Sequence, residues 1–102
     1  MKLENEKALI RTIAEGNTKS FEVLFYSYYP RLKGFICDLL QSPEEAEDIS
    51  QDIFTTLWQN RTSLDKIDNI SAYLFRIAKN AVYRHIERNM LFKNYQQKQT
   101  ES

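Results

Sequence analysis

Glycine and proline are scarce in this sequence. The 102 residues hold two of each, which are Gly16, Gly34, Pro30 and Pro43. This scarcity, with 42% hydrophobic residues, is typical of a folded helical protein and excludes a disordered chain except at its ends. A chain of this length forms one small domain, because it is too short for two independent cores.

Disulfides and long apolar runs are also missing. Cys37 is the single cysteine, so the chain has no internal disulfide, and a reducing compartment is the simplest context. The charged, periodic N-terminus has no apolar stretch long enough for a signal peptide or a membrane span. We therefore expect a cytoplasmic protein that does not insert into membranes.

The formal net charge is zero, so the total charge indicates no bulk attraction to nucleic acid or membrane. The distribution is uneven, because acidic residues gather between Glu44 and Asp52. The last third of the chain is basic between residues 76 and 93, where Glu87 is the one acidic residue. The cations of this stretch are Arg76, Lys79, Arg84, Arg88 and Lys93. The pattern predicts a dipolar molecule.

The hydrophobic period predicts an all-α bundle of four helices with no strand. The first helix is expected over about 4–15, ended by Gly16 in a left-handed conformation. The second runs from an N-cap at Thr18 to about Leu40, with a kink or brief break near Pro30. Its expected inward residues are Phe21, Leu24, Phe25, Tyr28, Leu32, Phe35, Ile36, Leu39 and Leu40.

The third helix has a strong start signal: Ser42 as N-cap, Pro43 at the first position and Glu45 closing a capping box. It is expected to end near residue 60, followed by a polar connection over 61–69. The fourth helix starts near Ile70, and its apolar pattern fades after Arg88, which predicts a frayed tail or linker over 91–102. Its expected inward residues are Leu74, Ile77, Ala78, Ala81 and Ile86.

The third helix has two different faces. One is an apolar stripe for the core, made of Ala46, Ile49, Ile53, Phe54, Leu57 and Trp58. The other is polar and holds Glu44, Asp48, Gln51, Asp52 and Thr55. Carboxylates four residues apart weaken an isolated helix by a few tenths of a kcal/mol per pair, and no basic residue relieves them between Pro43 and Trp58.

The helix dipole explains acidic residues in a first turn, so Glu44 and Glu45 alone fit an ordinary exposed helix start equally well. Asp48 and Asp52 lie beyond that turn, where the dipole has faded. They favour a basic partner.

The fourth helix carries a polar face opposite its core side. It consists of Arg76, Asn80, Tyr83, Arg84 and Glu87, flanked by Lys79 and Arg88. A solvated face is the alternative interpretation, because exposed helices are commonly charged. Cations neutralise phosphates, asparagine pairs with base edges, and the rings of Tyr73, Phe75 and Tyr83, otherwise core, can stack on unpaired bases.

The connection over 61–69 lies between the acidic and the basic helix, where a small pocket can form, although most loops of this length merely connect. Trp58 and the aromatic run over 25–29 are assigned to core and near-core packing. Catalysis has little support: His85 is the only histidine, Cys37 is expected to be buried, and no glycine-rich phosphate loop or metal-ligand spacing occurs. We predict no enzyme activity, cofactor or metal.

Three segments in this order resemble conserved region 2 of bacterial sigma-70-type initiation factors, above all the extracytoplasmic-function (ECF) group. They are FEVLFYSYYPRLKGF at 21–35, AEDISQDIFTTLW at 46–58 and AYLFRIAKNAVYRHIER at 72–88. The likeness covers about 18–88, and three linked motifs are more specific than one. It implies the compact four-helix domain of that family over 1–90.

The resemblance implies two macromolecular partners. The third helix would bind the clamp helices of the RNA polymerase β′ subunit through Asp48, Gln51 and Asp52, with Glu44 and Thr55 on the same face. The fourth helix and the preceding loop would recognise and melt the promoter minus-ten element, and the loop would hold a base flipped from the non-template strand. The residues implied on DNA are Ser63, Lys66, Arg76, Lys79, Asn80, Tyr83, Arg84 and Arg88.

The resemblance also implies an anti-sigma factor as a partner. Family members carry a second helical domain, region 4, which reads the minus-thirty-five element, and nothing in this sequence resembles it. We therefore expect a fragment that cannot recognise a full promoter by itself. The alternative function is a sigma-like helical module that binds a regulator without contacting DNA.

Overall fold

Helices account for nearly all of the described chain. The computed structural model describes residues 6–101, with side chains as far as residue 91. Its elements are α1 (Glu6–Ala14), α2 (Thr18–Leu40), α3 (Pro43–Gln59), the 3₁₀ helix η1 (Arg61–Lys66) and α4 (Ile70–Glu101). No strand occurs in this range, which confirms the all-α prediction, and η1 is an additional short helix.

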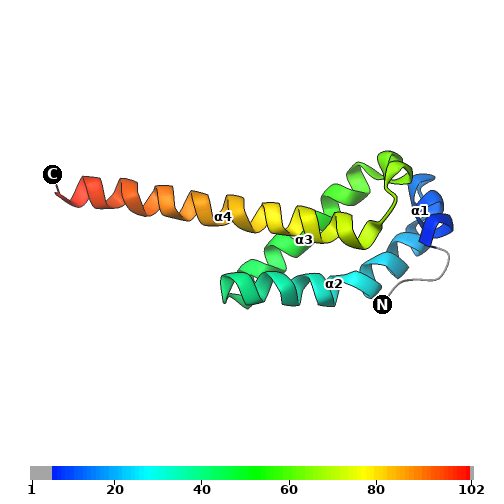
Figure 1. Cartoon of the computed structure of the whole chain (residues 1–102), viewed down its shortest axis with the longest axis horizontal. Helices are drawn as coiled ribbons and strands as arrows, with labels where there is room; N and C mark the ends of the chain where they lie inside the picture. The colour runs from blue at the N-terminus through cyan, green and yellow to red at the C-terminus, as the bar shows by residue number, and fades with distance from the viewer. Residues whose placement is uncertain (1–5, 102) are drawn as a thin grey trace.

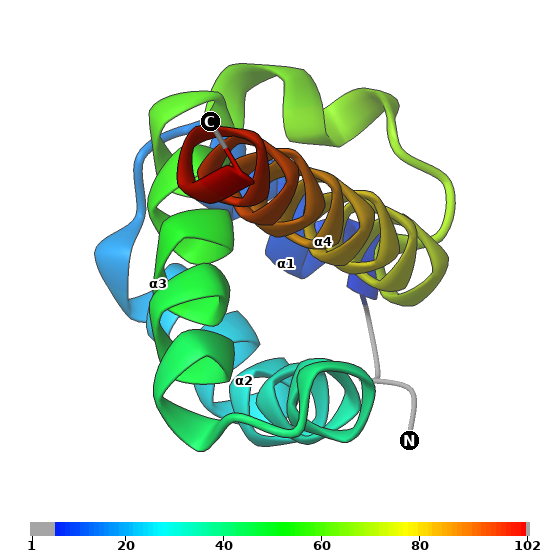
Figure 2. The same ribbon diagram turned by 90° about the vertical axis from the view of Figure 1, so that its left-hand side faces the viewer.

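α2, α3 and the first half of α4 pack together as a bundle. α2 packs against α3 and α4, while α1 packs against η1 and the start of α2. Figure 2 looks nearly along α4 and shows α3 beside it and α2 below it. The second half of α4 projects past the other helices (Figure 1), which gives the molecule principal extents of 59 × 23 × 20 Å.

The turn from α1 to α2 places the helix cap one residue earlier than expected. Gly16 has a φ of +97°, and the N–H of Asn17 donates to the Thr12 carbonyl at 3.0 Å. Asn17 is therefore left in an extended conformation, and its Oδ1 accepts the N–H of Ser20 at 3.0 Å. The prediction of Thr18 as N-cap is wrong, since Thr18 is already the first helical residue.

α2 is an unbroken helix that contains Pro30. Figure 1 shows its first part inclined to its second, as expected where a proline removes a backbone hydrogen bond, but no break occurs. The helix ends at Leu40, and its C-cap residue Gln41 has a φ of 57° and donates its N–H to the Cys37 carbonyl at 2.7 Å.

α3 begins where its sequence signal predicts. The Ser42 hydroxyl accepts the Glu45 N–H at 3.3 Å, and Pro43 occupies the first turn. The Glu45 carboxylate pairs with His85 Nε2 of α4 at 3.1 Å. One half of the capping box is thus formed, and the glutamate links α3 to α4.

The core follows the predicted stripes with few exceptions. Its buried members come from every helix and are Ile10, Ile13, Leu24, Tyr28, Leu32, Ile36, Ala46, Ile53, Phe54, Leu57, Leu64, Ile70, Leu74, Ala78 and Val82. Among the side chains of α4 that the structure describes, as far as residue 91, the last buried one is Val82, which is 1% exposed, whereas Ile86 is 37% exposed. The inward assignment of Ile86 is wrong, because beyond Val82 only the end of α2 and the start of α3 lie beside α4, and they leave this side chain partly open to solvent.

Exceptions of the same kind occur on α2. Leu39, near its end, is exposed, and Tyr26, within the run assigned to core, is 74% exposed because it lies on the outer face. Cys37 is half-buried rather than buried. These three residues lie at the border of the apolar face of α2, or outside it, so the neighbouring helices do not cover them fully.

The segment expected as a polar loop is folded. In η1 the Leu64 side chain is 2% exposed, and η1 packs against α1. The Arg61 guanidinium donates to the Trp58 carbonyl at 2.9 Å and lies 4.4 Å from the centre of the Trp58 ring. One apolar anchor and one cation–π contact therefore fix the connection to the bundle.

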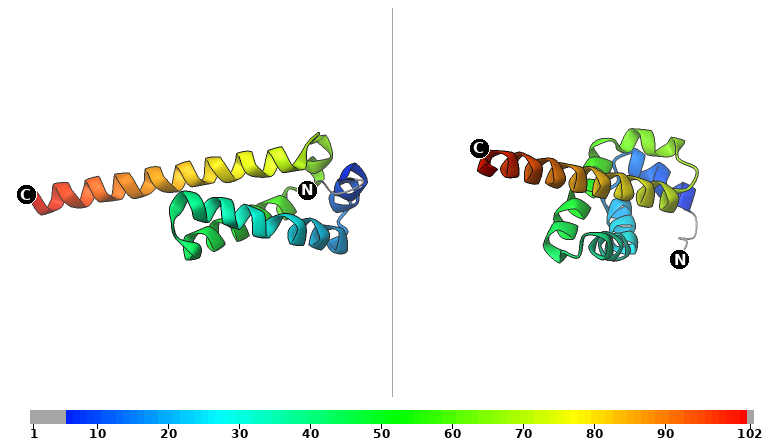
Figure 3. Two further views of the ribbon diagram at one scale, coloured as in Figure 1. Left: turned by 60° about the horizontal axis from the view of Figure 1, so that its bottom comes forward. Right: turned by 60° about the vertical axis from the view of Figure 1, so that its left-hand side comes forward.

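α4 continues well beyond Arg88, to Glu101, instead of fraying there (Figure 3). Met90 and Leu91 lie on this projecting part and are exposed. Only the first half of α4 therefore contributes to the core.

Candidate functional site

The polar face of α3 is exposed as predicted. This holds for each residue assigned to it: Glu44, Asp48, Gln51, Asp52 and Thr55. Within the described side chains, the two ion pairs within 4.0 Å are Lys33–Glu47 and Glu45–His85. Asp48 and Asp52 take part in neither. Their carboxylates are thus available to a partner.

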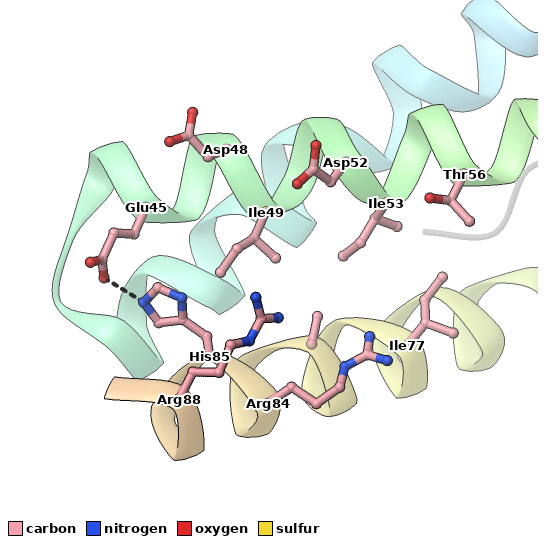
Figure 4. Close-up of a pocket in the computed structure, with 11 residues that line it drawn as sticks. Glu45, Asp48, Ile49, Asp52, Ile53, Thr56, Ile77, Arg84, His85 and Arg88 are labelled. Atoms are coloured by element: carbon pink, nitrogen blue, oxygen red, sulfur yellow. Dashed lines mark ion pairs between the residues drawn. The ribbon is translucent and has the colours of Figure 1, made fainter. Parts of the chain in front are cut away.

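A groove of about 430 Å³ separates this face from α4, and we call it the α3/α4 groove (Figure 4). Its apolar floor is made of Ile49, Ile53, Ile77 and Ala81. Asp48 and Asp52 line it from α3, and Arg84 and Arg88 line it from α4. In Figure 4 the Arg88 side chain extends toward α3, that of Arg84 runs along α4, and the Asp48 carboxylate points away from α4. The groove places two predicted polymerase-binding residues opposite two predicted DNA-binding residues.

A second groove, of about 620 Å³, lies on the other side of α3, against α2. Its walls are aromatic: Phe25 and Phe54 have ring centres 5.1 Å apart, as do Phe21 and Trp58. Gln51 and Thr55 line this α2/α3 groove. The predicted polymerase-binding residues therefore form a ridge between two grooves.

The basic face of α4 is also exposed, at each of its predicted DNA-binding residues: Arg76, Lys79, Asn80, Tyr83, Arg84 and Arg88. The Arg76 guanidinium lies 5.5 Å from the centre of the Tyr73 ring, and Lys79 Nζ lies 5.8 Å from that of Tyr83. These contacts hold a cation beside an aromatic ring, and such a pair can meet a phosphate and a base together.

A hollow of about 360 Å³ occurs where the connection enters α4. Lys66 and Arg76, two predicted DNA-binding residues, line it together with Tyr73 and Asn69. Asn69 Oδ1 caps α4 by accepting the Ala72 N–H at 3.1 Å. Ser63 is not among the lining residues, and its hydroxyl donates to the Asn60 carbonyl at 2.8 Å. The hollow therefore brings Lys66 and Arg76 together and leaves Ser63 aside.

His85 has a structural position that the sequence did not predict. Its Nε2 lies 3.1 Å from Glu45 Oε2 and 3.2 Å from Asn89 Nδ2. The contact with Glu45 fixes the first turn of α3 against α4 at one end of the α3/α4 groove, whereas Asn89 lies on α4 itself. The sequence carries no signal for such a pair, because its partners are forty residues apart.

The titratable side chains of the described range bear on metal binding and on stability. No group of three or more His, Cys, Asp or Glu side chains gathers there in a way that suits a metal ion. Burial, and then the nearby Glu6 carboxylate, raise the pKa of the Tyr28 hydroxyl, with Arg31 opposing them. Tyr28 lies in the core, so this shift concerns stability. None of the described helices has the length and apolar character to cross a bilayer.

The Sigma-70 region 2 family model matches residues 24–91. The ECF RNA polymerase sigma factor RpoE of Cereibacter sphaeroides is 31% identical over 75 residues, which cover 72% of this chain and 41% of that protein. The RNA polymerase sigma-H factor of Pseudomonas aeruginosa is 23% identical over 83 residues, which cover 81% and 43%. The chain thus spans about two fifths of the length of these curated relatives.

The fold is also similar to that of an engineered region 2 of sigmaE, solved by NMR in complex with GTAAAA. The TM-score is 0.68 at 22% sequence identity, and the match covers 86% of this chain and 93% of the other.

Proposed function

We propose, because this chain belongs to the sigma-70 region 2 family as a region 2 domain of the ECF type, that it acts in transcription initiation. In this role it binds the RNA polymerase core and recognises promoter DNA without catalysing a reaction. We assign the domain to residues 1–90 and the start of a linker to 91–102. The observation that carries the proposal is the pair of exposed faces: carboxylates on α3 and cations on α4, in a chain with no net charge.

The α3 ridge is proposed to bind the β′ clamp helices. Asp48 and Asp52 are exposed, and neither takes part in an ion pair within the described side chains. Like charges four residues apart destabilise a free helix, and a cationic surface would relieve that repulsion on binding. Gln51 adds an amide on the same ridge. The ridge therefore fits a basic helical partner.

The α4 face is proposed to contact the minus-ten element, chiefly its unpaired non-template strand. Arg76, Lys79, Arg84 and Arg88 would neutralise phosphates, and Asn80 would contact a base edge. The engineered region 2 of sigmaE has the same fold and is in complex with the oligonucleotide GTAAAA, which supports a single-stranded ligand here.

The hollow at the start of α4 is proposed to accept a flipped base. Tyr73 supplies a ring, and Lys66 and Arg76 supply cations for the flanking phosphates. Unstacking a base costs a few kcal/mol, which stacking and the fit to the hollow would have to offset.

An anti-sigma factor is proposed as a further partner. The α2/α3 groove supports a protein contact, because half-buried Phe21, Phe25 and Trp58 side chains line it next to the ridge. A regulator bound there would cover Gln51 and Thr55 and compete with the polymerase.

Two titrations test the two halves of the function separately. The first measures fluorescence anisotropy of a labelled single strand containing GTAAAA, and the second measures binding to a β′ clamp-helix fragment. Binding of both is expected. Binding of the fragment alone would favour a protein-interaction module, and binding of neither would contradict the proposal.

A further inference from the structure

The hollow at the start of α4 has two walls of different kinds. One wall is made of Ala72, Tyr73 and Arg76, which lie on the continuous helix α4. The other wall consists of residues 66–69, where the chain leaves η1 and runs to α4. The shape of the hollow therefore depends on what holds η1 in place.

η1 needs support from the rest of the fold. It has six residues, and 3₁₀ helices longer than three or four residues are uncommon because their hydrogen-bond geometry is poor. Its Leu64 side chain is buried in the same core cluster as Ile10 and Ile13 of α1. The Leu64 carbonyl accepts the N–H of Ile67 at 3.0 Å, and Ile67 lines the hollow. Leu64 thus links the core to the second wall.

α1 is the chief support of η1. η1 packs mainly against α1, and Figure 1 shows both at the end of the molecule opposite the projecting part of α4. The Arg61 side chain runs beside the turn that follows α1, since a Cβ on Gly16 would lie 3.9 Å from Arg61 Nε. A hydrogen bond between the hydroxyls of Thr12 and Ser20, with oxygens 2.7 Å apart, fixes α1 to α2. None of the residues that line the hollow comes from α1.

We infer that α1 positions the wall of the hollow for the flipped base. Ile10 and Ile13 hold Leu64 in the core, and Leu64 in turn holds the chain at Ile67. This inference rests on the proposed base contact. A wall that is already ordered spares the ordering cost that a flexible loop would pay on binding. The region 2 family model begins at residue 24, so α1 lies outside the segment that it matches.

A scan with abasic strands measures the base contact separately from the phosphate contacts. The whole chain is titrated with the GTAAAA-containing strand and with strands that lack one base at a time. The base contribution is the ratio of the Kd of the most weakened abasic strand to the Kd of the intact strand. All strands carry the same phosphates, and stacking of one base predicts a ratio of about ten for the wild type.

Two truncations weaken the packing of η1 on α1, Ile10→Ala on one side and Leu64→Ala on the other. Ile36→Ala is the matched control, because it removes a buried aliphatic side chain of the same size from the second half of α2. Circular dichroism selects a temperature at which all variants are folded. Ile10→Val and Leu64→Met are milder changes at the same two positions.

We expect the base contribution to fall to within about twofold of unity in Ile10→Ala and Leu64→Ala, and to stay near its wild-type value in Ile36→Ala. The salt dependence of binding should be the same in all of them, because the phosphate contacts on α4 are unchanged. Leu64→Met nearly conserves the volume of the side chain and should retain the wild-type ratio. Ile10→Val should lower the ratio by about twofold.

A wild-type ratio in both Ile10→Ala and Leu64→Ala, or an equal fall in Ile36→Ala, would overturn the role of α1 and leave the base contact intact. If the alanine variants do not fold, Ile10→Val decides, and a ratio equal to that of the wild type overturns the inference. If no abasic strand binds the wild type more weakly than the intact strand, the proposed base contact fails, and this inference fails with it.

Discussion

At the scale of single residues, the candidate site depends on exposed charges whose removal should leave the fold intact. Asp48 and Asp52 lie on the outer face of α3, away from Ala46 and Phe54, which hold that helix to the core. Binding and stability can therefore be changed separately.

Charge reversal tests the proposed polymerase contact. Asp48→Arg or Asp52→Arg should abolish binding to a β′ clamp-helix fragment, because a repulsive pair would replace an attractive one at the contact. Surface plasmon resonance with the immobilised fragment measures this effect.

The matched control for charge reversal is Glu22→Arg, which makes the same charge change on exposed α2. It should retain binding within about a factor of three. All three variants should keep the thermal midpoint of the parent within a few degrees. Unchanged binding after both aspartate reversals would refute the contact.

Tyr28 makes stability sensitive to alkaline pH. Burial raises its pKa in the folded state above the value of about 10 in the unfolded chain. As pH rises, Tyr28 therefore loses its proton in the unfolded state before it does so in the folded state. Its contribution to the unfolding free energy is complete below about pH 10 and is lost as pH rises through the pKa of the folded state.

Urea unfolding at pH 9 and at pH 11 measures this effect. The wild type should lose more unfolding free energy between these values than Tyr28→Phe does. Tyr26→Phe should behave like the wild type, because Tyr26 is largely exposed. An equal loss in all three proteins would show that Tyr28 does not cause the dependence.

At the scale of elements, local sequence signals predicted where helices start well, but they predicted poorly which residues of each helix are buried. Ser42 and Pro43 fix the start of α3, since a cap and its helix are neighbours in sequence. At the start of α2 the N-cap is Asn17 rather than Thr18, because the left-handed conformation of Gly16 leaves Asn17 as the extended residue before the helix. Propensity alone did not distinguish the two.

The point at which the buried side of a helix ends depends on the neighbouring helices, and the sequence alone did not predict it. The period of α4 admits both Val82 and Ile86, but only the surrounding helices decide where its core side ends. The 3₁₀ helix around Leu64 was likewise missed, because one apolar residue among polar ones resembles a loop.

The same reasoning holds for the candidate site. The two faces were predictable from helical spacing, whereas the α3/α4 groove and the Glu45–His85 pair were not, because both join distant segments.

Two alanine substitutions on α4 test where its packing ends. Val82→Ala should lower the unfolding free energy by about 2 kcal/mol, because it removes buried methyl groups. Ile86→Ala removes more atoms but should cost less than about 1 kcal/mol, because that side chain is partly exposed. Urea denaturation measures both, and a larger cost at Ile86 would contradict the observed end of the core.

At the scale of the whole molecule, the net charge is zero although the exposed face of α3 is acidic and that of α4 is basic. Long-range attraction to DNA is therefore weak, and binding must come from cations that touch phosphates. This makes the salt dependence of binding a measure of individual contacts on α4. Substituting a residue that neutralises a phosphate should change the salt dependence of DNA binding, whereas substituting a residue that contacts a base should not.

Salt titrations of the GTAAAA-containing strand separate the two kinds of contact. Arg76→Gln or Lys79→Gln should weaken binding and reduce the slope of log affinity against log salt by about 0.7, the value for one phosphate on a single strand. Asn80→Ala should weaken binding and leave the slope unchanged, because a neutral amide releases no counterion. Lys19→Gln, on exposed α2 away from this face, is the matched control and should change neither quantity. If the slope falls equally for Lys19→Gln and Arg76→Gln, DNA is attracted by the overall charge of the domain, and the face on α4 has no special role.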